Sequence, residues 1–336
     1  MWRLRHDDPE RGVIAPLTAI LMVAMLGMAA FAVDVAMMYS EHAQLQNGAD
    51  SAALAIADSC AKTPTAASCT APMSFATGFA NGNALDGHTN VLSATVTSDA
   101  SSGTVNVTTQ SQDTSGNNHF SLVFARVLGI QVTDIQASAE AKWKYPTKGR
   151  SVLPLAFATC EFIDDGLPHK ILIQGGAQDC NGRNPSNQII PGGFAWLAPD
   201  GNTGCNVTAE VGQWSLTSSG GSVPTGCMDL FDPSKNPDLA NSIVAIPVYK
   251  YTCSGMSTSQ FGSCNGSTVQ YFIEKWAGFK LQAWNLSGQA KYNAGVFSGS
   301  EKGLYGTFVG YSADPGLFTG GSTTQNGNVI VVGLTK

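Results

Sequence analysis

The sequence predicts an α+β fold in three parts: a single N-terminal transmembrane helix extended into a stalk, a small α+β unit, and a C-terminal, mainly β, disulfide-containing domain. Three observations support this prediction. An uncharged apolar run lies near the N-terminus, alternating and turn-rich segments follow it, and all eight cysteines come after it. The expected boundaries are a cytoplasmic N-terminus at 1–12, a transmembrane helix at 13–33, the stalk and α+β unit at 34–145, and a β-rich extracytoplasmic domain at 146–336.

The apolar run at residues 13–33 has the length of a membrane span. It contains no charged residue, and an α-helix of this length covers roughly 30 Å, the thickness of the hydrocarbon core of a bilayer. Arg3, Arg5 and Arg11 precede it, whereas residues 12–61 contain no Lys or Arg. The positive-inside bias therefore predicts a single-pass protein of the cell membrane, with lipid as a partner and its body outside. The alternative is a cleaved signal peptide, whose apolar region is normally only about 7–15 residues long.

Helical periodicity continues beyond the membrane segment. Several apolar residues recur at helical spacing and share one face: Met38, Leu45, Ala49, Ala52 and Ile56. This pattern predicts one long helix from Val13 to Ala57, half in lipid and half a stalk. Two helices broken near Asp34 or Gly48 are the alternative.

The cysteines indicate an oxidising compartment. They are Cys60, Cys69, Cys160, Cys180, Cys205, Cys227, Cys253 and Cys264. None forms the C-x-x-C pair that is usual for structural zinc, and an even, dispersed set is typical of a disulfide framework in an exported chain. Buried free thiols in a cytosolic protein are the alternative. The first two cysteines are close enough to bridge. The other six permit fifteen pairings, of which we expect Cys160–Cys180, Cys205–Cys227 and Cys253–Cys264.

The exported body is expected to be mainly strands. Alternating apolar residues on either side of the turn at 101–103 predict a hairpin over residues 91–107. Residues 119–128 have helical spacing, 135–143 are expected to form a further strand, and 146–149 are expected to be a linker. Beyond the linker, short apolar runs between Gly- and Pro-rich turns are typical of a β sandwich or barrel-like domain.

No enzymatic chemistry is recognisable in the sequence. The net charge is −6 with no cluster of Lys and Arg, which argues against nucleic acid as a partner. The five histidines are scattered without an H-E-x-x-H pattern, and no serine lies in a G-x-S-x-G turn. We therefore expect no enzyme, no cofactor and no metal site. Four tryptophans either belong to the core or line a sugar-binding face: Trp196, Trp214, Trp276 and Trp284.

Three N-terminal segments carry a family resemblance: Arg11-Gly12 before the apolar run, Phe31-Ala-Val-Asp-Val35, and Leu45-Gln-Asn-Gly-Ala-Asp-Ser-Ala-Ala-Leu-Ala55. Together they resemble the N-terminus of TadE/TadG-like proteins of the tight-adherence (Flp-type) pilus assembly systems. The resemblance implies that the small α+β unit is pilin-like. One departure is Leu17, which occupies the fifth position after Gly12, where pilins cut by a prepilin peptidase carry Glu.

The resemblance implies a non-enzymatic structural component of a pilus assembly apparatus, whose partners are Tad machinery proteins or pilin-like helices. The residues expected to form its helix-packing and interface stripe are Asp34, Leu45, Gln46, Asn47, Ala49 and Asp50. The alternative is a membrane-tethered adhesin whose C-terminal domain binds a surface glycan.

Overall fold

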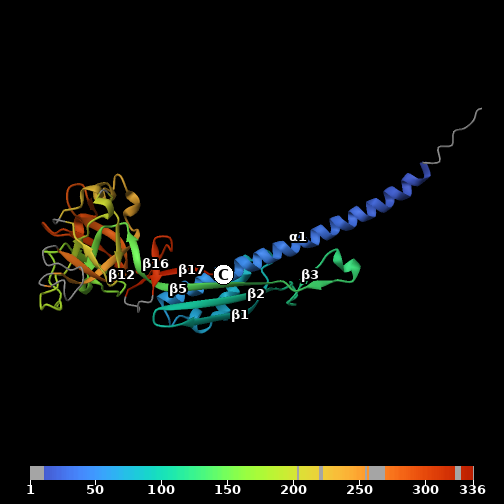
Figure 1. Cartoon of the computed structure of the whole chain (residues 1–336), viewed down its shortest axis with the longest axis horizontal. Helices are drawn as coiled ribbons and strands as arrows, with labels where there is room; N and C mark the ends of the chain where they lie inside the picture. Colours follow the sequence, from blue (N-terminus) through green and yellow to red (C-terminus); the bar gives the residue numbers. More distant parts are fainter. Residues whose placement is uncertain are drawn as a thin grey trace, which may run out of the picture.

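The computed structural model describes residues 11–202, 204–218, 222–253, 256, 269–321 and 327–335. The molecule is elongated (Figure 1). A long helix projects from one end, a small sheet packs under its second half, and a β-rich body forms the other end. The α+β prediction is therefore confirmed, with a long apolar helix preceding a mostly β body.

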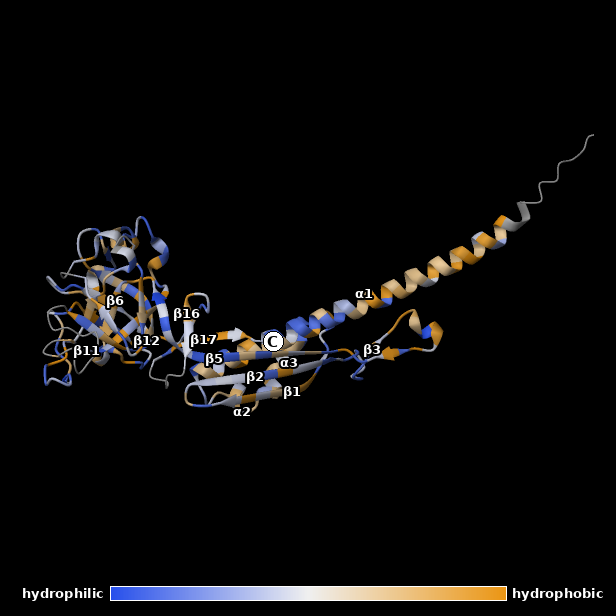
Figure 2. Ribbon diagram, in the orientation of Figure 1, coloured by the Kyte–Doolittle hydropathy of each residue, from blue (hydrophilic) through white to orange (hydrophobic). Residues whose placement is uncertain are grey.

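Helix α1 (Arg11–Lys62) is continuous through Asp34 and Gly48, so the broken-helix alternative is wrong. Its first half is solvent-exposed and apolar, and Figure 2 shows the colour changing towards polar where the sheet begins. Within the described residues, this one helix is long and apolar enough to cross a membrane.

The second half of α1 packs on a small sheet and two short helices, α2 (Ala67–Thr70) and α3 (Pro72–Asn83). The predicted hairpin is confirmed as β1 (Thr89–Ser98) and β2 (Ser102–Ser111), which pair antiparallel. The sheet order is β1-β2-β5-β17-β15. Ile56 and several alanines of α1 share a core with residues of β2 and β5, including Val105, Val107, Ala141 and Trp143.

Residues 119–128 do not form the predicted helix. They contain β3 (Phe120–Ser121) and a single 3-10 turn, η1 (Ala125–Leu128), and β4 (Val132–Thr133) follows and pairs with β3. Gly129, with a φ of 86°, ends the turn in the left-handed conformation, which favours glycine. Asp34 binds the amides just before the turn, as described below, and this tertiary contact replaces further helical hydrogen bonds.

Residues 146–149, predicted as a linker, lie inside the long strand β5 (Gln136–Ser151). Beyond its pairing with β2, this strand continues into pairs with β16 (Phe318–Gly321) and β9 (Val207–Glu210). Pro146 is tolerated because it lies at a register shift opposite Gly320, where a missing N–H does least harm. Strand β17 (Val329–Leu334) returns to pair with β5, and its Ile330 joins the core under α1. The boundary at 145/146 stays a prediction.

The β-rich body is built on a second sheet of order β7-β14-β12-β11-β6-β8. Its strands are β6 (Leu155–Ala158), β7 (Pro168–Leu172), β8 (Phe194–Trp196), β10 (Trp214–Leu216), β11 (Ile243–Thr252), β12 (Gln270–Asn285), β13 (Lys291–Tyr292) and β14 (Gly303–Phe308), with β15 (Tyr311–Ala313) in the first sheet. The remaining helices are η2 (Thr159–Glu161), η3 (Asp200–Asn202), η4 (Thr225–Cys227), α4 (Met228–Phe231), η5 (Pro237–Leu239) and η6 (Ala294–Val296). Phe157, Phe279 and Phe308 meet edge-on in its core.

Disulfides join neighbouring cysteines in the described residues. Their Cα–Cα distances are 5.5 Å for Cys60–Cys69, 5.6 Å for Cys160–Cys180 and 4.7 Å for Cys205–Cys227. Cys253 is buried, while Cys264 lies outside the described residues, so the fourth bridge stays a prediction.

Candidate functional site

The second half of α1 is a packing surface built from small residues. Leu45, Ala49 and Ile56 are buried against the sheet. On an adjacent face, Gly48 lies so close to α3 that a Cβ atom there would be 3.1 Å from the Cα of Ala80. The glycine therefore allows the two helices to cross closely, which a larger residue would prevent without a backbone shift.

Polar side chains fasten the same segment at its edges. The Gln46 amide donates to the Asp50 carboxylate at 2.8 Å and to the Ser138 carbonyl of β5 at 3.2 Å. On the α3 side, the Asn83 amide donates to the Ser51 hydroxyl at 3.0 Å. The segment from Leu45 to Ala55 is thus joined to the sheet on one side and to α3 on the other.

The structure distributes the predicted interface stripe over different environments. Asp34, Leu45 and Ala49 are buried in contacts within the chain, Gln46 and Asp50 are half-buried, and Asn47 is exposed. Whether any of these residues contacts another protein stays a prediction. Asn47 is the member of the stripe whose side chain is most open to one.

Asp34 makes a long-range contact with residues 123–125. The amides of Val123 and Phe124 donate to one carboxylate oxygen at 3.0 and 3.1 Å, and the Ala125 amide donates to the other at 2.5 Å. Only 3% of Asp34 is exposed. The three donors precede or begin η1, so the carboxylate fastens this turn to α1. We call this contact the Asp34 clasp.

The environment of Asp34 favours its charged form. Burial raises its pKa, but the three backbone N–H donors lower it, and the nearby Arg126 guanidinium lowers it further. The net effect holds the pKa of this carboxyl below its ordinary value. The sequence placed Asp34 after the apolar run and in the expected interface stripe, but it could not predict these donors, which lie about ninety residues later in the chain.

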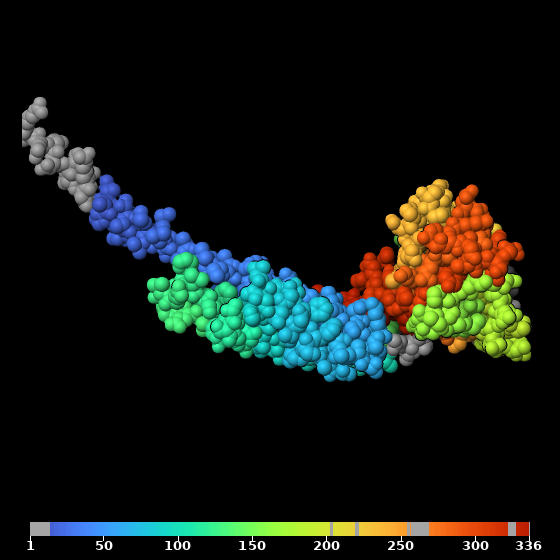
Figure 3. All heavy atoms as spheres, turned by 180° about the vertical axis from the view of Figure 1, so that it is seen from behind, coloured from blue at the N-terminus to red at the C-terminus, as the bar shows by residue number. Residues whose placement is uncertain are grey.

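Mostly apolar residues surround the clasp on the side of the N-terminal half of α1. Gly27, Ala30 and Phe31 of α1 and Phe124, Val127 and Leu128 of the turn line a cavity of about 220 Å³ together with Asp34 and Ala125. Figure 3 shows the turn, in green, against the blue first half of α1.

The comparison with protein families gives a match over most of α1, the helix that contains Asp34. Residues 12–59 match a family model described as Tad, putative Flp pilus-assembly TadE/G-like. Residues 12–59 form a TadE/G-like segment. The recognised resemblance is thereby confirmed for this part of the chain. Comparison with curated proteins and with solved structures gives no match.

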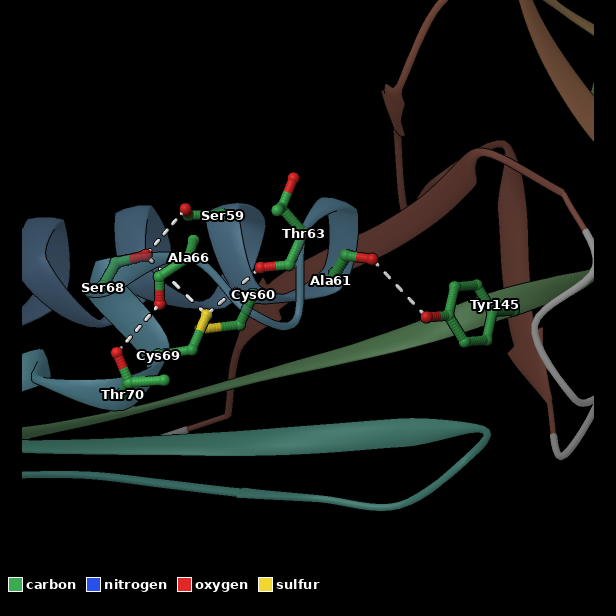
Figure 4. The surroundings of a disulfide bond; sticks show 9 residues. All are labelled: Ser59, Cys60, Ala61, Thr63, Ala66, Ser68, Cys69, Thr70 and Tyr145. Carbon is green, nitrogen blue, oxygen red and sulfur yellow. Dashed lines mark hydrogen bonds between the residues drawn. A yellow bond between two sulfur atoms is a disulfide. The ribbon is translucent and has the colours of Figure 1, made fainter. Parts of the chain in front are cut away.

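The TadE/G-like segment ends directly before a disulfide (Figure 4). Cys60, in the last turns of α1, bonds to Cys69 of α2, and the Ser68 hydroxyl donates to that of Ser59 at 2.7 Å. On the other side of the helix end, the Tyr145 hydroxyl lies 3.5 Å from the Ala61 carbonyl. These contacts fix the end of α1 to its neighbours in the fold.

Replacing both Cys60 and Cys69 by serine is expected to lower the free energy of unfolding by about 2.5–3 kcal/mol. The bridge closes a short loop and so restricts the unfolded chain, and without it the unfolded chain gains conformational entropy. Denaturant unfolding of the full chain in detergent measures the change. A second double variant, Cys160→Ser with Cys180→Ser, opens a longer loop and should lose somewhat more. Equal stability of the first variant and the wild type would contradict the prediction.

Protonation of Asp34 should release the turn. Because folding lowers its pKa, the charged carboxylate stabilises the folded form above the unfolded-state pKa of about 3.9, and this contribution is lost as the pH falls through the folded-state value. Hydrogen–deuterium exchange, corrected for intrinsic rates, should therefore show the amides of residues 123–125 protected down to about pH 4 and losing protection below it. In Asp34→Asn the protection should be weaker than in the wild type above about pH 4 and should lack this pH dependence. An unchanged exchange rate in that variant would contradict the assigned contact.

The β-rich body presents fewer features of a binding site. Among the described residues, no group of three His, Cys, Asp or Glu side chains could hold a metal ion. Trp196, Trp276 and Trp284 are buried, so their ring faces are not presented to a sugar. Trp214 is half-buried and packs on Tyr251 and Phe272.

Proposed function

We propose that the chain is a membrane-anchored structural component of a Tad/Flp-type pilus assembly apparatus, acting through helix packing and extracytoplasmic protein contacts. The TadE/G-like segment supports the pilus-related role. The properties of α1 support the membrane anchoring, the orientation and the contacts with partners.

The main support for the proposal is that the exposure of apolar side chains changes along α1 at Asp34. Before it, side chains such as Ile20 and Val23 are 68% and 71% exposed, whereas Ala49 and Ile56 after it are fully buried. A continuous exposed apolar surface of this kind is unfavourable in water at roughly 25 cal/mol per Å². Lipid removes that penalty over the first half, and the chain's own sheet removes it over the second.

The orientation follows from charge. Arg3, Arg5 and Arg11 precede the span, which favours a cytoplasmic N-terminus and an exported body. The disulfides agree with this assignment because they form in oxidising compartments. In this arrangement residues 1–12 are cytoplasmic, 13–33 span the membrane, 34–145 form the pilin-like unit, and 146–336 form the outer domain.

The exposed side of the TadE/G-like helix is the proposed contact surface for pilin-like helices or other Tad machinery proteins. Asn47 lies on it, while Leu45 and Ala49 are occupied by the chain's own sheet. Gln46 and Asp50 border it through their mutual hydrogen bond. The helix thus has one face for its own fold and one left for a neighbour.

Deletion of the gene, with complementation by wild type and by Asn47→Trp, tests this function. Deletion should abolish or strongly reduce surface pili, and wild type should restore them. Asn47→Trp should fold and reach the membrane but restore pili poorly, whereas Leu85→Trp, at an 88% exposed position outside α1, serves as the control and should restore them. Normal pili after deletion, or a full-length chain recovered in the soluble fraction, would refute the proposal.

A further inference from the structure

The turn held by the Asp34 clasp exposes an unusual amount of apolar surface. Val127 and Leu128 are 84% and 81% exposed, and Ile130 is 55% exposed. Polar residues flank this group on both sides, at Asn117 and Asn118 before β3 and at Gln131, Thr133 and Asp134 after Ile130. Most of this exposed apolar surface lies within residues 122–130, which we call the apolar turn; Val132 beyond it is 46% exposed. Figure 2 shows apolar colour around β3 alongside the first half of α1.

The position of the apolar turn along α1 determines the depth of the turn in the bilayer. Its residues share a cavity with Gly27, Ala30 and Phe31, all of which lie within the predicted span of residues 13–33. Because an α-helix rises about 1.5 Å per residue, Gly27 lies roughly 10 Å towards the membrane centre from Asp34. A span that ends near residue 33 therefore places the apolar turn at the level of the extracytoplasmic leaflet.

Most backbone amides of the apolar turn are hydrogen-bonded within the protein, as a lipid environment requires. Irregular backbone in hydrocarbon must find its hydrogen-bond partners within the protein, since no water is available. Leu122 donates to the Gln131 carbonyl at 2.9 Å, and Asp34 accepts from the next three amides. Further along, the amides of Val127, Gly129 and Ile130 donate to carbonyls within the turn at 3.0–3.2 Å.

We propose that the apolar turn inserts into the extracytoplasmic leaflet beside α1, with acyl chains against Val127, Leu128 and Ile130. This inference rests on the proposed membrane anchoring and adds a second contact with lipid. The exposed Arg126 side chain is long enough to reach the phosphate layer from this depth, as interfacial arginines do. The Asp34 carboxylate satisfies three amides that lipid would otherwise leave unpaired.

Two lipid contacts have a mechanical consequence. A single helix is free to rotate about its axis and to change its tilt in the bilayer, whereas side anchors fix both. Because the Asp34 clasp holds the apolar turn against α1, the side of the helix next to the turn stays at the membrane–water interface. The exposed face around Asn47 then has a defined direction relative to the membrane.

The test places an environment-sensitive fluorescent amino acid, encoded genetically, at one position at a time in the full chain in lipid nanodiscs. The positions are Val23 at the middle of the span, Leu128 in the apolar turn, and Leu85, which is 88% exposed beside the small sheet. Quenching by nitroxide-bearing lipids reports contact with acyl chains, and quenching by iodide reports contact with water.

We expect lipid nitroxides to quench labels at Val23 and Leu128 and iodide to quench the label at Leu85 several-fold more than either. Nitroxides near the glycerol end should act best at Leu128, and those near the chain end best at Val23. Asp34→Asn should reduce lipid quenching at Leu128 and leave Val23 unchanged.

Each contrary outcome has a distinct meaning. A water-accessible label at Leu128 together with a lipid-embedded label at Val23 would overturn this inference and leave the membrane anchor intact. A water-accessible label at Val23 would overturn the proposed function. A label at Leu128 shielded from both quenchers would place another protein over the apolar turn, which also overturns the lipid contact.

Discussion

Replacing Ile56 by alanine is expected to lower the free energy of unfolding of the α1–sheet unit by about 2–5 kcal/mol. Ile56 is fully buried in the cluster that joins α1 to β2 and β5. Truncation removes its buried methyl and methylene groups and leaves a cavity that closely packed neighbours fill only in part. Guanidinium unfolding of the full chain in detergent, followed by near-UV circular dichroism, measures the loss.

Asn47→Ala is the matched control because Asn47 lies on the same helix but is exposed. Its effect on unfolding should stay within about 0.5 kcal/mol. If Ile56→Ala also changed stability by less than this amount, the second half of α1 would not be held by the sheet as described. Restoration of stability by Ile56→Leu, which nearly conserves volume, would confirm that packing is the cause.

Replacing Trp284 by alanine is expected to lower the free energy of unfolding of the β-rich body by about 3–5 kcal/mol. Trp284 is fully buried, stacks on Tyr292 with ring centroids 4.9 Å apart, and meets Phe231 edge-on. Its indole N–H donates to the Phe231 carbonyl at 2.9 Å. The substitution therefore removes a large packed ring and leaves a buried carbonyl without its donor.

Trp284→Phe separates the two contributions, since it keeps an aromatic ring and removes the N–H donor. We expect it to lose less than the alanine variant but still about 1–3 kcal/mol, the usual effect of leaving a buried polar atom unpaired. Thermal unfolding monitored by near-UV circular dichroism ranks the three proteins. An alanine variant with the wild-type transition would show that Trp284 is not a core residue.

Local patterns predicted the elements whose partners are close in sequence. The seven-, four- and three-residue spacing from Met38 to Ile56 predicted one face of α1, and the Ser-Ser-Gly turn at 101–103 predicted the β1–β2 hairpin. The motif from Leu45 to Ala55 led to the family resemblance that the match over residues 12–59 confirms.

The failures share one physical cause. Phe120, Val123, Phe124 and Val127 have helical spacing, yet Asp34 takes the amides that precede η1 and the chain bends instead. Pro146 and Gly149 read as a linker, yet strand partners from residues 207–210 and 318–321 hold them in β5. In both cases distant hydrogen-bond partners outweighed local propensity.

Residue order was therefore sufficient for the membrane-length helix, the family of its N-terminal segment, the hairpin and the mainly β character of the body. These features depend on short-range periodicity, composition and charge, which a chain carries whatever its final shape. Only the tertiary structure decided what Asp34 binds, that β5 continues past β2 to pair with β16 and β9, and that β17 returns to the core under α1. Those contacts join residues that are far apart in the chain, and no local pattern specifies which distant partner closes them.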